Sequence, residues 1–246
     1  EATRARTAFY RSVSHELATP MTPIVGYVKL LADEELGPLN EAQRKALRAV
    51  QECVGRLRGQ IDNLLDVTGL ETGAMRFARA PYDVVAVVKR VVRMVEPRCA
   101  ERGLRMVAEI PDRKLAATGD ADRLARGIFQ VFDNAVKFTP SGASIGVRVA
   151  RNGAAVDICV ADQGPGIPRE LLEKVLDPFF QADGSPTRKF GGVGVGLAIA
   201  RRVAVGHGGN LTLRSPANER IGGTEFRGTS CLFTVAEHPP LPPEQS

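Results

Sequence analysis

The most constraining feature of this sequence is a run of apolar residues spaced alternately three and four positions apart. The run consists of Leu47, Val50, Val54, Leu57, Ile61 and Leu64. This spacing puts all its members on one stripe of an α-helix, as in the seam of a coiled coil or a helical bundle. The pattern ends near Thr72-Gly73. The sequence therefore predicts an all-α domain over residues 1–73.

A looser apolar stripe comes before this helix and indicates a second one, made of Phe9, Val13, Leu17, Ile24, Val28 and Leu31. Gly37 and Pro38 lie between the two stripes and predict a turn, because glycine ends helices and proline resists continuing them. Asn40 is expected to cap the second helix, with Gln43 at the position of a capping box. A two-helix hairpin has little core of its own, so we expect a homodimer that forms a four-helix bundle.

From residue 74 onward, helical and strand patterns alternate. Helices are expected over 83–102, 120–138, 168–176 and 195–205. Strands are expected over 104–110, 144–150, 154–161, 209–215 and 229–236, with an Asn152-Gly153 hairpin turn. Helices layered on one face of a mixed sheet form an α+β two-layer sandwich, which we expect over 74–238. The proline-rich segment 239–246 is expected to be a disordered tail.

Composition argues against several classes of protein. The net charge of +5 is spread along the chain, whereas nucleic-acid-binding proteins concentrate basic residues in a stripe, so we expect no nucleic-acid partner. The four cysteines form no CxxC pair, and we expect buried, reduced thiols in a cytoplasmic protein. No apolar run approaches the roughly 20 residues of a membrane span, so we expect no membrane contact within this sequence. Because the chain opens at Glu1 inside a polar helical pattern, we expect a fragment whose parent could carry a membrane anchor upstream.

Two glycine-rich segments give the first chemical signal. Residues 162–166, Asp-Gln-Gly-Pro-Gly, follow a predicted strand, and the glycines of 191–196 precede a predicted helix. Glycine lets the backbone approach a ligand closely, and the free N–H groups at a helix N-terminus bind phosphate. Neither segment is a Walker loop, because no Gly-Lys-Ser/Thr follows. Either one alone fits a flexible surface loop equally well.

The predicted helix over 120–138 could contribute ligands. Gln130 and Asn134 are four residues apart and share one face, and Lys137 lies one turn further on. An asparagine carbonyl can ligate Mg²⁺, and a lysine can neutralise phosphate charge. Without the glycine-rich segments, an ordinary amphipathic helix with a polar face would explain these residues better.

His15 is a candidate nucleophile. It lies beside Glu16, off the apolar stripe of a helix that Pro20 should kink, and it is one of only three histidines. A lone helical histidine is more often a surface or core residue. An exposed neutral imidazole can nevertheless act as a nucleophile while the adjacent carboxylate accepts its other proton.

Together these segments resemble the sensor histidine kinase family over nearly the whole chain. The similar motifs, in family order, are the H box at 14–20, the N box at 133–140, the first glycine box at 162–166, the F box at 177–181 and the second glycine box at 192–196. His207-Gly208-Gly209 and Gly228-Thr229 match later landmarks of the family. Ala18 replaces the arginine that is common in the H box. Each motif is moderately specific alone, and their shared order makes the resemblance strong.

The resemblance implies a protein histidine kinase that binds ATP and Mg²⁺ and phosphorylates its own His15, with Glu16 as the general base. The phosphoryl group would then pass to an aspartate of a cognate response regulator. Glu16 and Thr19 also match the pattern that permits regulator dephosphorylation. Asp162 would accept a hydrogen bond from the adenine amino group, and Asn134 would hold Mg²⁺ through the phosphates. The implied ATP site consists of Gln130, Asn134, Lys137, Phe138, Asp162, Gly164, Gly166, Ile167, Phe179, Arg188, Lys189, Gly192, Gly194, Gly196, Leu197 and Thr229.

Three departures from the family pattern leave two alternatives open. Gln130 stands where an asparagine is usual, Val193 stands where a threonine is frequent, and the connection 214–227 is longer than usual. We expect this connection to be an exposed loop without an assigned role. A catalytically weak ATP-binding scaffold is one alternative, supported by Gln130 and Val193. The other is an ATPase of the related gyrase and mismatch-repair fold. Those ATPases activate water with a glutamate at the position of Gln130, and glutamine cannot accept a proton.

Overall fold

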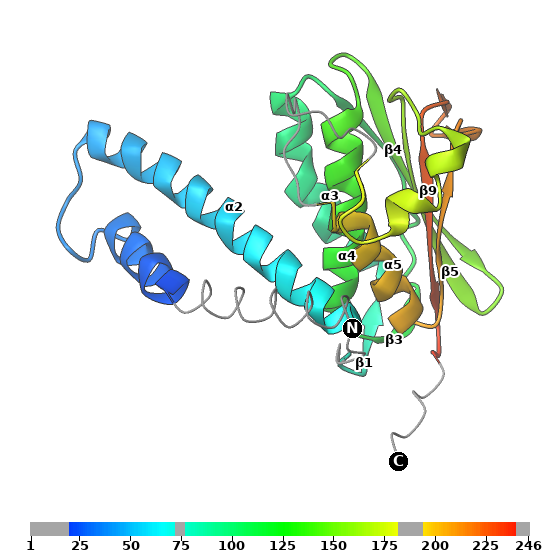
Figure 1. Cartoon of the computed structure of the whole chain (residues 1–246), viewed down its shortest axis with the longest axis horizontal. Helices are drawn as coiled ribbons and strands as arrows, with labels where there is room; N and C mark the ends of the chain where they lie inside the picture. The colour runs from blue at the N-terminus through cyan, green and yellow to red at the C-terminus, as the bar shows by residue number, and fades with distance from the viewer. Residues whose placement is uncertain (1–19, 72–76, 182–193, 240–246) are drawn as a thin grey trace. The chain divides into compact units, whose positions relative to one another are not determined.

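A computed structural model describes residues 20–71, 77–181 and 194–239, and the side chains of 56, 58 and 60–71 lie outside this description. The chain divides into two compact units, residues 1–75 and 76–246 (Figure 1). Among the described helices, none combines the length and apolar character needed to cross a membrane.

The first unit is a helical hairpin. A helix over residues 20–32 is followed by a turn and by α2 (Glu41–Glu71). The predicted capping box is confirmed: the Gln43 N–H donates to Asn40 Oδ1 over 2.8 Å, and the Asn40 N–H donates to Gln43 Oε1 over 2.9 Å. Glu34 and Gly37 in the turn have positive φ angles. These reciprocal bonds fix the start of α2.

The second unit is built on a mixed five-stranded sheet in the order β2-β4-β5-β9-β6, in which only the β2–β4 pair is parallel. Its helices are α3 (Val84–Glu101), α4 (Ala121–Phe138) and α5 (Gly196–Gly206). The sheet strands are β2 (Arg105–Glu109), β4 (Ser144–Asn152), β5 (Ala155–Asp162), β6 (Leu211–Arg214) and β9 (Ser230–Ala236). A separate two-stranded sheet pairs β1 (Ala80–Asp83) with β3 (Ala116–Gly119).

The three helices cover one face of the sheet, as expected for a two-layer sandwich (Figure 1). Alternate residues such as Ile145, Ile158 and Phe233 point to this face and are fully buried. Gly127 of α4 lies against Phe233, where an added Cβ would come within 3.2 Å of the ring. The buried side of α4 includes Leu124 and Phe132. Burial of these apolar side chains between helices and sheet is the main stabilising contribution to this unit.

Two local predictions are corrected by the structure. The expected helix over 168–176 is instead a pair of 3₁₀ turns, η1 (Arg169–Leu171) and η2 (Lys174–Leu176). The segment is short and lies between Pro168 and Pro178, and Asp177 before the second proline is extended, so no α-helix can continue through it. The β4–β5 turn consists of Gly153-Ala154, because Asn152 still pairs with Ala155. Gly153 has a φ of 60°, which suits the first position of a tight hairpin turn.

The connection 214–227 is not the exposed loop that the sequence suggested. It forms a hairpin of β7 (Glu219–Ile221) and β8 (Thr224–Phe226) on the sheet face opposite the helices. Ile221 and Phe226 are fully buried there against Ala161. The prediction failed because most residues of this connection are polar or glycine. Its two buried apolar side chains pack against a strand that is distant in the sequence.

Two smaller expectations also change. Pro239, assigned to the tail, is buried, and its carbonyl accepts a hydrogen bond from Arg79 Nη1 over 3.4 Å, while 240–246 lie outside the described residues. Cys99, Cys159 and Cys231 are buried free thiols, but Cys53 is exposed on α2. The expectation for Cys53 rested on its apolar sequence neighbours, which point to different sides of a helix.

Candidate nucleotide site

Helix α4 carries one wall of the candidate site. Gln130, Asn134 and Phe138 follow one another at intervals of four residues and share one face over roughly 12 Å of helix. The Asp120 side chain caps the start of α4 by accepting the Arg123 N–H over 3.0 Å. Arg102 from α3 donates to the last carbonyls, those of Val136 and Lys137, at 2.6 and 3.0 Å. Both ends of this wall are therefore fixed.

The segment 162–166 forms a tight loop at the end of β5. Asp162 Oδ1 accepts the backbone N–H groups of Gly164 and Thr229 at 2.8 and 3.0 Å. Both bonds end on the same oxygen, so Oδ2 keeps its lone pairs for another donor. The main chain of Asp162 also pairs with Thr229 and Gly228. The loop thus presents one oxygen of a fixed carboxylate.

The glycines of this loop permit close packing against the end of α4. A Cβ on Gly164 would come within 3.2 Å of the Phe138 carbonyl oxygen and 2.8 Å of Asp162 Oδ1. A Cβ on Gly228 would lie 2.3 Å from the same carboxylate oxygen. Side chains at these two positions would collide with the carboxylate or the helix end. The structure therefore brings Asp162 and the C-terminal end of α4 together.

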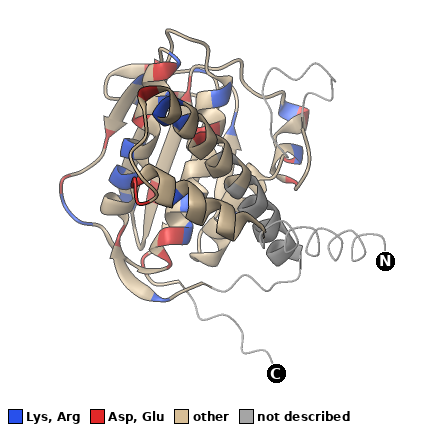
Figure 2. Ribbon diagram, turned by 90° about the vertical axis from the view of Figure 1, so that its left-hand side faces the viewer, with Lys and Arg blue, Asp and Glu red and all other residues tan. Residues whose placement is uncertain are grey.

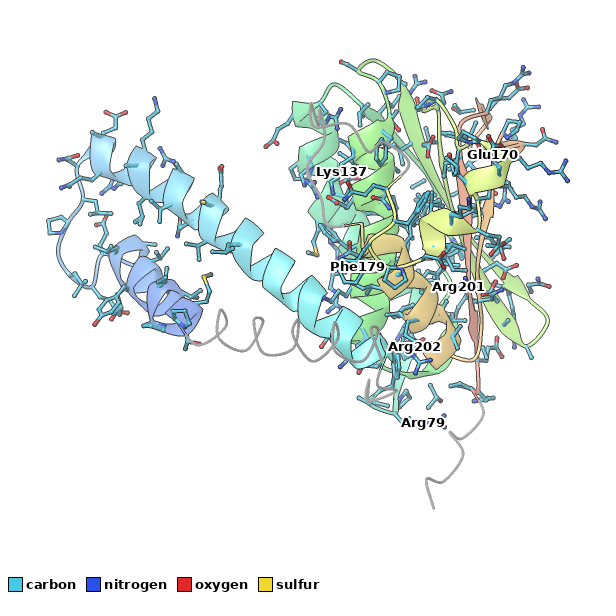
Figure 3. All side chains as sticks on the ribbon, in the orientation of Figure 1. Arg79, Lys137, Glu170, Phe179, Arg201 and Arg202 are labelled. Atoms are coloured by element: carbon cyan, nitrogen blue, oxygen red, sulfur yellow. The ribbon has the colours of Figure 1, made fainter. Side chains whose placement is uncertain are left out.

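The second glycine-rich segment meets the other end of the same face. A Cβ on Gly196, the first residue of α5, would lie 2.8 Å from Gln130 Oε1. Gly194 has a φ of 73°, and its carbonyl accepts the Phe179 N–H over 2.8 Å. The F-box segment is therefore bonded to the second glycine segment, whose Gly196 lies beside Gln130 in the middle of α4. Figure 3 shows Lys137 on α4 and Phe179 on the segment before α5.

Lys137 belongs to a charged cluster at the C-terminal half of α4. Its Nζ lies 2.5 Å from Asp133 Oδ2, and Arg98 Nη2 from α3 lies 2.6 Å from Asp133 Oδ1. Arg98 also lies over the ring of Phe129, 5.6 Å from its centroid. One carboxylate thus holds two cations. Because Arg98 can balance Asp133 alone, Lys137 can turn toward a phosphate without leaving that carboxylate unpaired.

Burial raises the pKa of the Asp162 carboxyl, although the N–H groups of Thr229 and Gly164 oppose the shift. The direction follows from the cost of holding a charge away from water. A half-buried carboxylate with one free oxygen is suited to a polar donor on a ligand. The site therefore combines an acceptor, Asp162, with a cation on α4, Lys137.

The described residues include most of the predicted site. It brings together Gln130, Phe138, Asp162, Gly164, Phe179, Gly194, Gly196 and Thr229 through the contacts above. Gly166 and Ile167 continue the Asp162 loop, and Asn134 and Leu197 lie on α4 and α5 beside its contacts. The predicted residues outside the described part of the chain are His15, Glu16, Thr19, Arg188, Lys189 and Gly192.

Two contributors escaped the sequence reasoning. The hydroxyl of Ser215 accepts the Ile167 N–H over 2.7 Å and donates to the Gly228 carbonyl over 3.1 Å. Arg98 reaches Asp133 from a separate helix. Ser215 lies 48 positions from Ile167, and Arg98 lies 35 positions from Asp133. Neither residue has a motif around it, so no sequence signal marked them.

Comparison with known proteins identifies the two units. Residues 5–73 match the family described as His Kinase A (phospho-acceptor) domain. Residues 119–238 match the family described as Histidine kinase-, DNA gyrase B-, and HSP90-like ATPase. The two matches cover most of the chain in the order expected. This chain belongs to the sensor histidine kinase family. The resemblance stated from the motifs and the expected fold class are confirmed, and the second match assigns ATP binding to the α+β sandwich.

Relatives with two-domain cores of this kind are numerous. The chain is 37% identical over 227 residues to hybrid signal transduction histidine kinase D of Dictyostelium discoideum, covering 90% of the chain and 14% of that protein. It is 30% identical over 232 residues to sensor histidine kinase WalK of Bacillus subtilis, covering 94% of the chain and 36% of that protein. The chain therefore spans well under half the length of these curated relatives.

Solved histidine kinase structures agree with the fold. Full-length ShkA in complex with AMPPNP matches with a TM-score of 0.66 and 26% identity, over 93% of this chain and 45% of that one. The mycobacterial sensor histidine kinase MprB matches with a TM-score of 0.53 and 27% identity, over 66% of this chain and all of that one.

Proposed function

We propose that this histidine kinase core uses ATP to phosphorylate His15 and then transfers the phosphoryl group to an aspartate of a cognate response regulator. The observation that carries the proposal is that α4 contacts both glycine segments, with the Phe138 carbonyl beside Gly164 and the Gln130 amide beside Gly196. We assign the phosphoacceptor domain to residues 1–73 and the ATP-binding domain to residues 74–238. Because Pro239 is buried, we extend the ATP-binding domain by this one residue.

Asp162 would select adenine. Its Oδ1 is occupied by two backbone N–H groups, so Oδ2 can accept the adenine amino group. The adjacent glycines let the base approach the backbone closely. The phosphates would then lie beside α4, within reach of Asn134 and Lys137.

The phosphate end would be neutralised by Lys137 and by Mg²⁺ on Asn134. The Asn134 side chain is half-buried and has no hydrogen-bond partner within the described residues. A free amide oxygen suits a hard cation that takes most of its other ligands from phosphates and water. When bound, Mg²⁺ would withdraw charge from the phosphoryl oxygens. Lys137 would leave Asp133 to Arg98 and turn to the phosphates.

His15 would act as the nucleophile. Its Nε2 would form a bond to the γ-phosphorus while the bond to the bridging oxygen of ADP breaks, and Glu16 would take the proton from Nδ1. The regulator aspartate would later accept the phosphoryl group from Nε2. In a separate reaction, Thr19 would orient a water molecule that attacks the aspartyl phosphate of the regulator and releases inorganic phosphate. The chemistry depends on positioning, because phosphoryl transfer needs charge neutralisation more than covalent help.

The two alternatives make different demands on Gln130. Its side chain is only 8% exposed and lies beside Gly196. A buried amide cannot activate water as a general base, which disfavours an ATPase. A non-catalytic scaffold would bind nucleotide without labelling itself.

A labelling experiment tests the proposal. The full chain incubated with Mg²⁺ and ATP that is radioactive at the γ-phosphate should acquire an acid-labile label, since phosphoramidates hydrolyse in acid. His15→Gln should abolish labelling, whereas His238→Gln, at an exposed histidine, should leave it unchanged.

Each contrary outcome has its own meaning. Labelling of His15→Gln would refute the assignment of the phosphoacceptor. Nucleotide binding without labelling of the wild type would favour the scaffold. Steady release of free phosphate without a labelled protein would favour the ATPase.

A further inference from the structure

The β7–β8 hairpin is a docked element of the ATP-binding domain. Ile221 and Phe226 are fully buried against Ala161, with the half-buried Val107 beside them. Gly146 of β4 leaves the space for the Phe226 ring, since a Cβ there would come within 2.6 Å of it. A hairpin without this apolar contact would be marginal in water. The sheet therefore holds the hairpin in one position.

Polar contacts fix the hairpin further. Arg148 Nη2 from β4 lies 2.8 Å from Glu219 Oε2, and its Nη1 donates to the Arg220 carbonyl over 3.2 Å. Glu109 of β2 accepts the Gly222 N–H at the hairpin turn over 3.1 Å. These contacts come from β4, which contains Gly146, and from its neighbour β2. The hairpin is consequently anchored at its turn as well as along β7.

The base of the hairpin is bonded to the nucleotide loop. The Gly228 carbonyl accepts the Ala217 N–H over 2.9 Å and the Ser215 hydroxyl over 3.1 Å. The same hydroxyl accepts the Ile167 N–H over 2.7 Å, and the Gly228 N–H donates to the Asp162 carbonyl over 3.0 Å. Both ends of the loop 162–167 therefore depend on residues that flank the hairpin.

Gln163 makes a second connection in the middle of the loop. Its Nε2 donates to the Glu225 carbonyl of β8 over 2.8 Å, and its Oε1 accepts the Ser144 N–H of β4 over 2.8 Å. Gln163 stands between Asp162 and Gly164, the residue whose N–H orients the Asp162 carboxylate. The amide uses one donor toward the hairpin and one acceptor toward the sheet, so a side chain with a single function cannot replace it.

We propose that the β7–β8 hairpin is a brace for the adenine-binding loop and that Gln163 and Ser215 are positioning residues that set nucleotide affinity. The proposal rests on ATP binding at Asp162. The brace holds the loop in its binding conformation before the nucleotide arrives, which reduces the ordering that binding requires. Gln163 itself need not touch the nucleotide.

Direct nucleotide binding tests the brace. The full chain is titrated calorimetrically with Mg²⁺ and AMPPNP, and thermal unfolding is recorded in parallel. Gln163→Glu can still accept the Ser144 N–H but cannot donate to the Glu225 carbonyl, so it should raise Kd by about fivefold, as expected for one lost hydrogen bond. At saturating ATP, the rate of self-labelling should be unchanged, because the loop does not touch the transferred phosphoryl group.

Variants of the hairpin separate positioning from stability. Ile221→Ala lies outside the nucleotide loop and loosens the hairpin, so it should also raise Kd several-fold at temperatures where the protein is folded. Arg220→Ala, at the neighbouring exposed side chain, should leave Kd unchanged. A merely structural role for the hairpin would lower Tm in Ile221→Ala without changing Kd.

Two results would contradict these proposals. If Kd for folded Gln163→Glu stays within about twofold of the wild type, well under the effect of one hydrogen bond, the brace is refuted, even if Ile221→Ala fails to fold. If the wild type itself binds no nucleotide, the proposed function fails, and with it the basis of this inference.

Discussion

At the scale of single residues, the Asp162 carboxyl shows how backbone geometry prepares a side chain for a ligand. The backbone N–H groups of Gly164 and Thr229 both donate to Oδ1 of this carboxyl, and Oδ2 stays open for another donor. Burial raises the pKa of this carboxyl against the effect of the two N–H groups. The group is therefore easier to protonate than an ordinary aspartate.

This shift predicts a pH dependence of nucleotide binding. Above the raised pKa of Asp162 the carboxylate is present and Kd should be constant. As the pH falls through that pKa, the proton occupies the acceptor position and Kd should rise by about tenfold per pH unit. Calorimetric titration of the full chain with AMPPNP between neutral and mildly acidic pH measures this.

Asp162→Asn provides the control for the titration. It should bind weakly at all pH values and lose the acid-dependent component. An unchanged acid-dependent rise of Kd in Asp162→Asn would assign the titration to another group, such as the nucleotide phosphates.

At the scale of elements, α4 depends on its N-terminal cap. Asp120 Oδ1 accepts the Arg123 N–H, and Oδ2 accepts the Ala78 N–H, both over 3.0 Å. Burial of Asp120 opposes ionisation, but these two N–H groups together with the Arg123 charge and His207 lower its pKa overall. The cap therefore joins α4 to the segment that enters the ATP-binding domain.

We expect Asp120→Ala to lower the free energy of unfolding of this domain by about 1–2 kcal/mol at neutral pH. Because the folded pKa of Asp120 lies below its unfolded value, this stability is present above the unfolded pKa and is lost as the pH falls through the folded one. The difference between variant and wild type should therefore shrink in acid. Urea unfolding followed by circular dichroism at several pH values measures it.

Asp122→Ala is the matched control for the cap. Asp122 lies in the first turn of α4 and pairs with Arg90, but its side chain is 87% exposed. Such surface pairs contribute little to stability. A loss in Asp122→Ala as large as that in Asp120→Ala would argue against capping as the cause.

At the scale of the whole molecule, the hairpin unit has more apolar surface than one chain can cover. Leu47 and Val54 of the α2 seam are half-buried, whereas Val50 and Leu57 are 45% and 42% exposed. Val50 and Leu57 are therefore available for a second copy. This supports a dimeric four-helix bundle, in which the seam would be covered on both sides.

A charge in the seam should separate the two copies. Val50→Glu is expected to weaken dimerisation by at least tenfold, because a carboxylate would be buried without a partner. Light scattering over a range of protein concentrations should show half the mass of the wild type. AMPPNP affinity should be unchanged, since the ATP-binding domain has its own core.

Gln51→Glu adds the same charge one position along α2, at an exposed residue outside the seam. It should keep the wild-type mass. A monomeric wild type would refute dimerisation through this seam.

Charged residues of both signs are mixed along the described part of the chain. In the view of Figure 2, Lys and Arg are interspersed with Asp and Glu over the described ribbon. Arg201 is exposed and Arg202 is half-buried, so these adjacent residues of α5 do not share one exposed surface (Figure 3). The described part of the chain therefore has no basic stripe in this view.

The sequence by itself determined what depends on short-range patterns. The α2 seam, its Asn40–Gln43 cap, the extent of α4 and the glycine segments are encoded within a few turns or a single strand. Periodicity and cap chemistry act locally, so they could be read without coordinates. Each motif is a short contiguous segment that can be recognised in the sequence. The order of these motifs along the chain then indicated the family.

Only the tertiary structure decided what depends on contacts between distant segments. Ile221 and Phe226 lie in a polar, glycine-rich stretch, and nothing nearby shows that Ala161 covers them. The bonds of Ser215 to Ile167 and of Gln163 to Glu225 span 48 and 62 positions. Burial and long-range hydrogen bonds arise when the sheet assembles, because the partner groups are adjacent only in three dimensions.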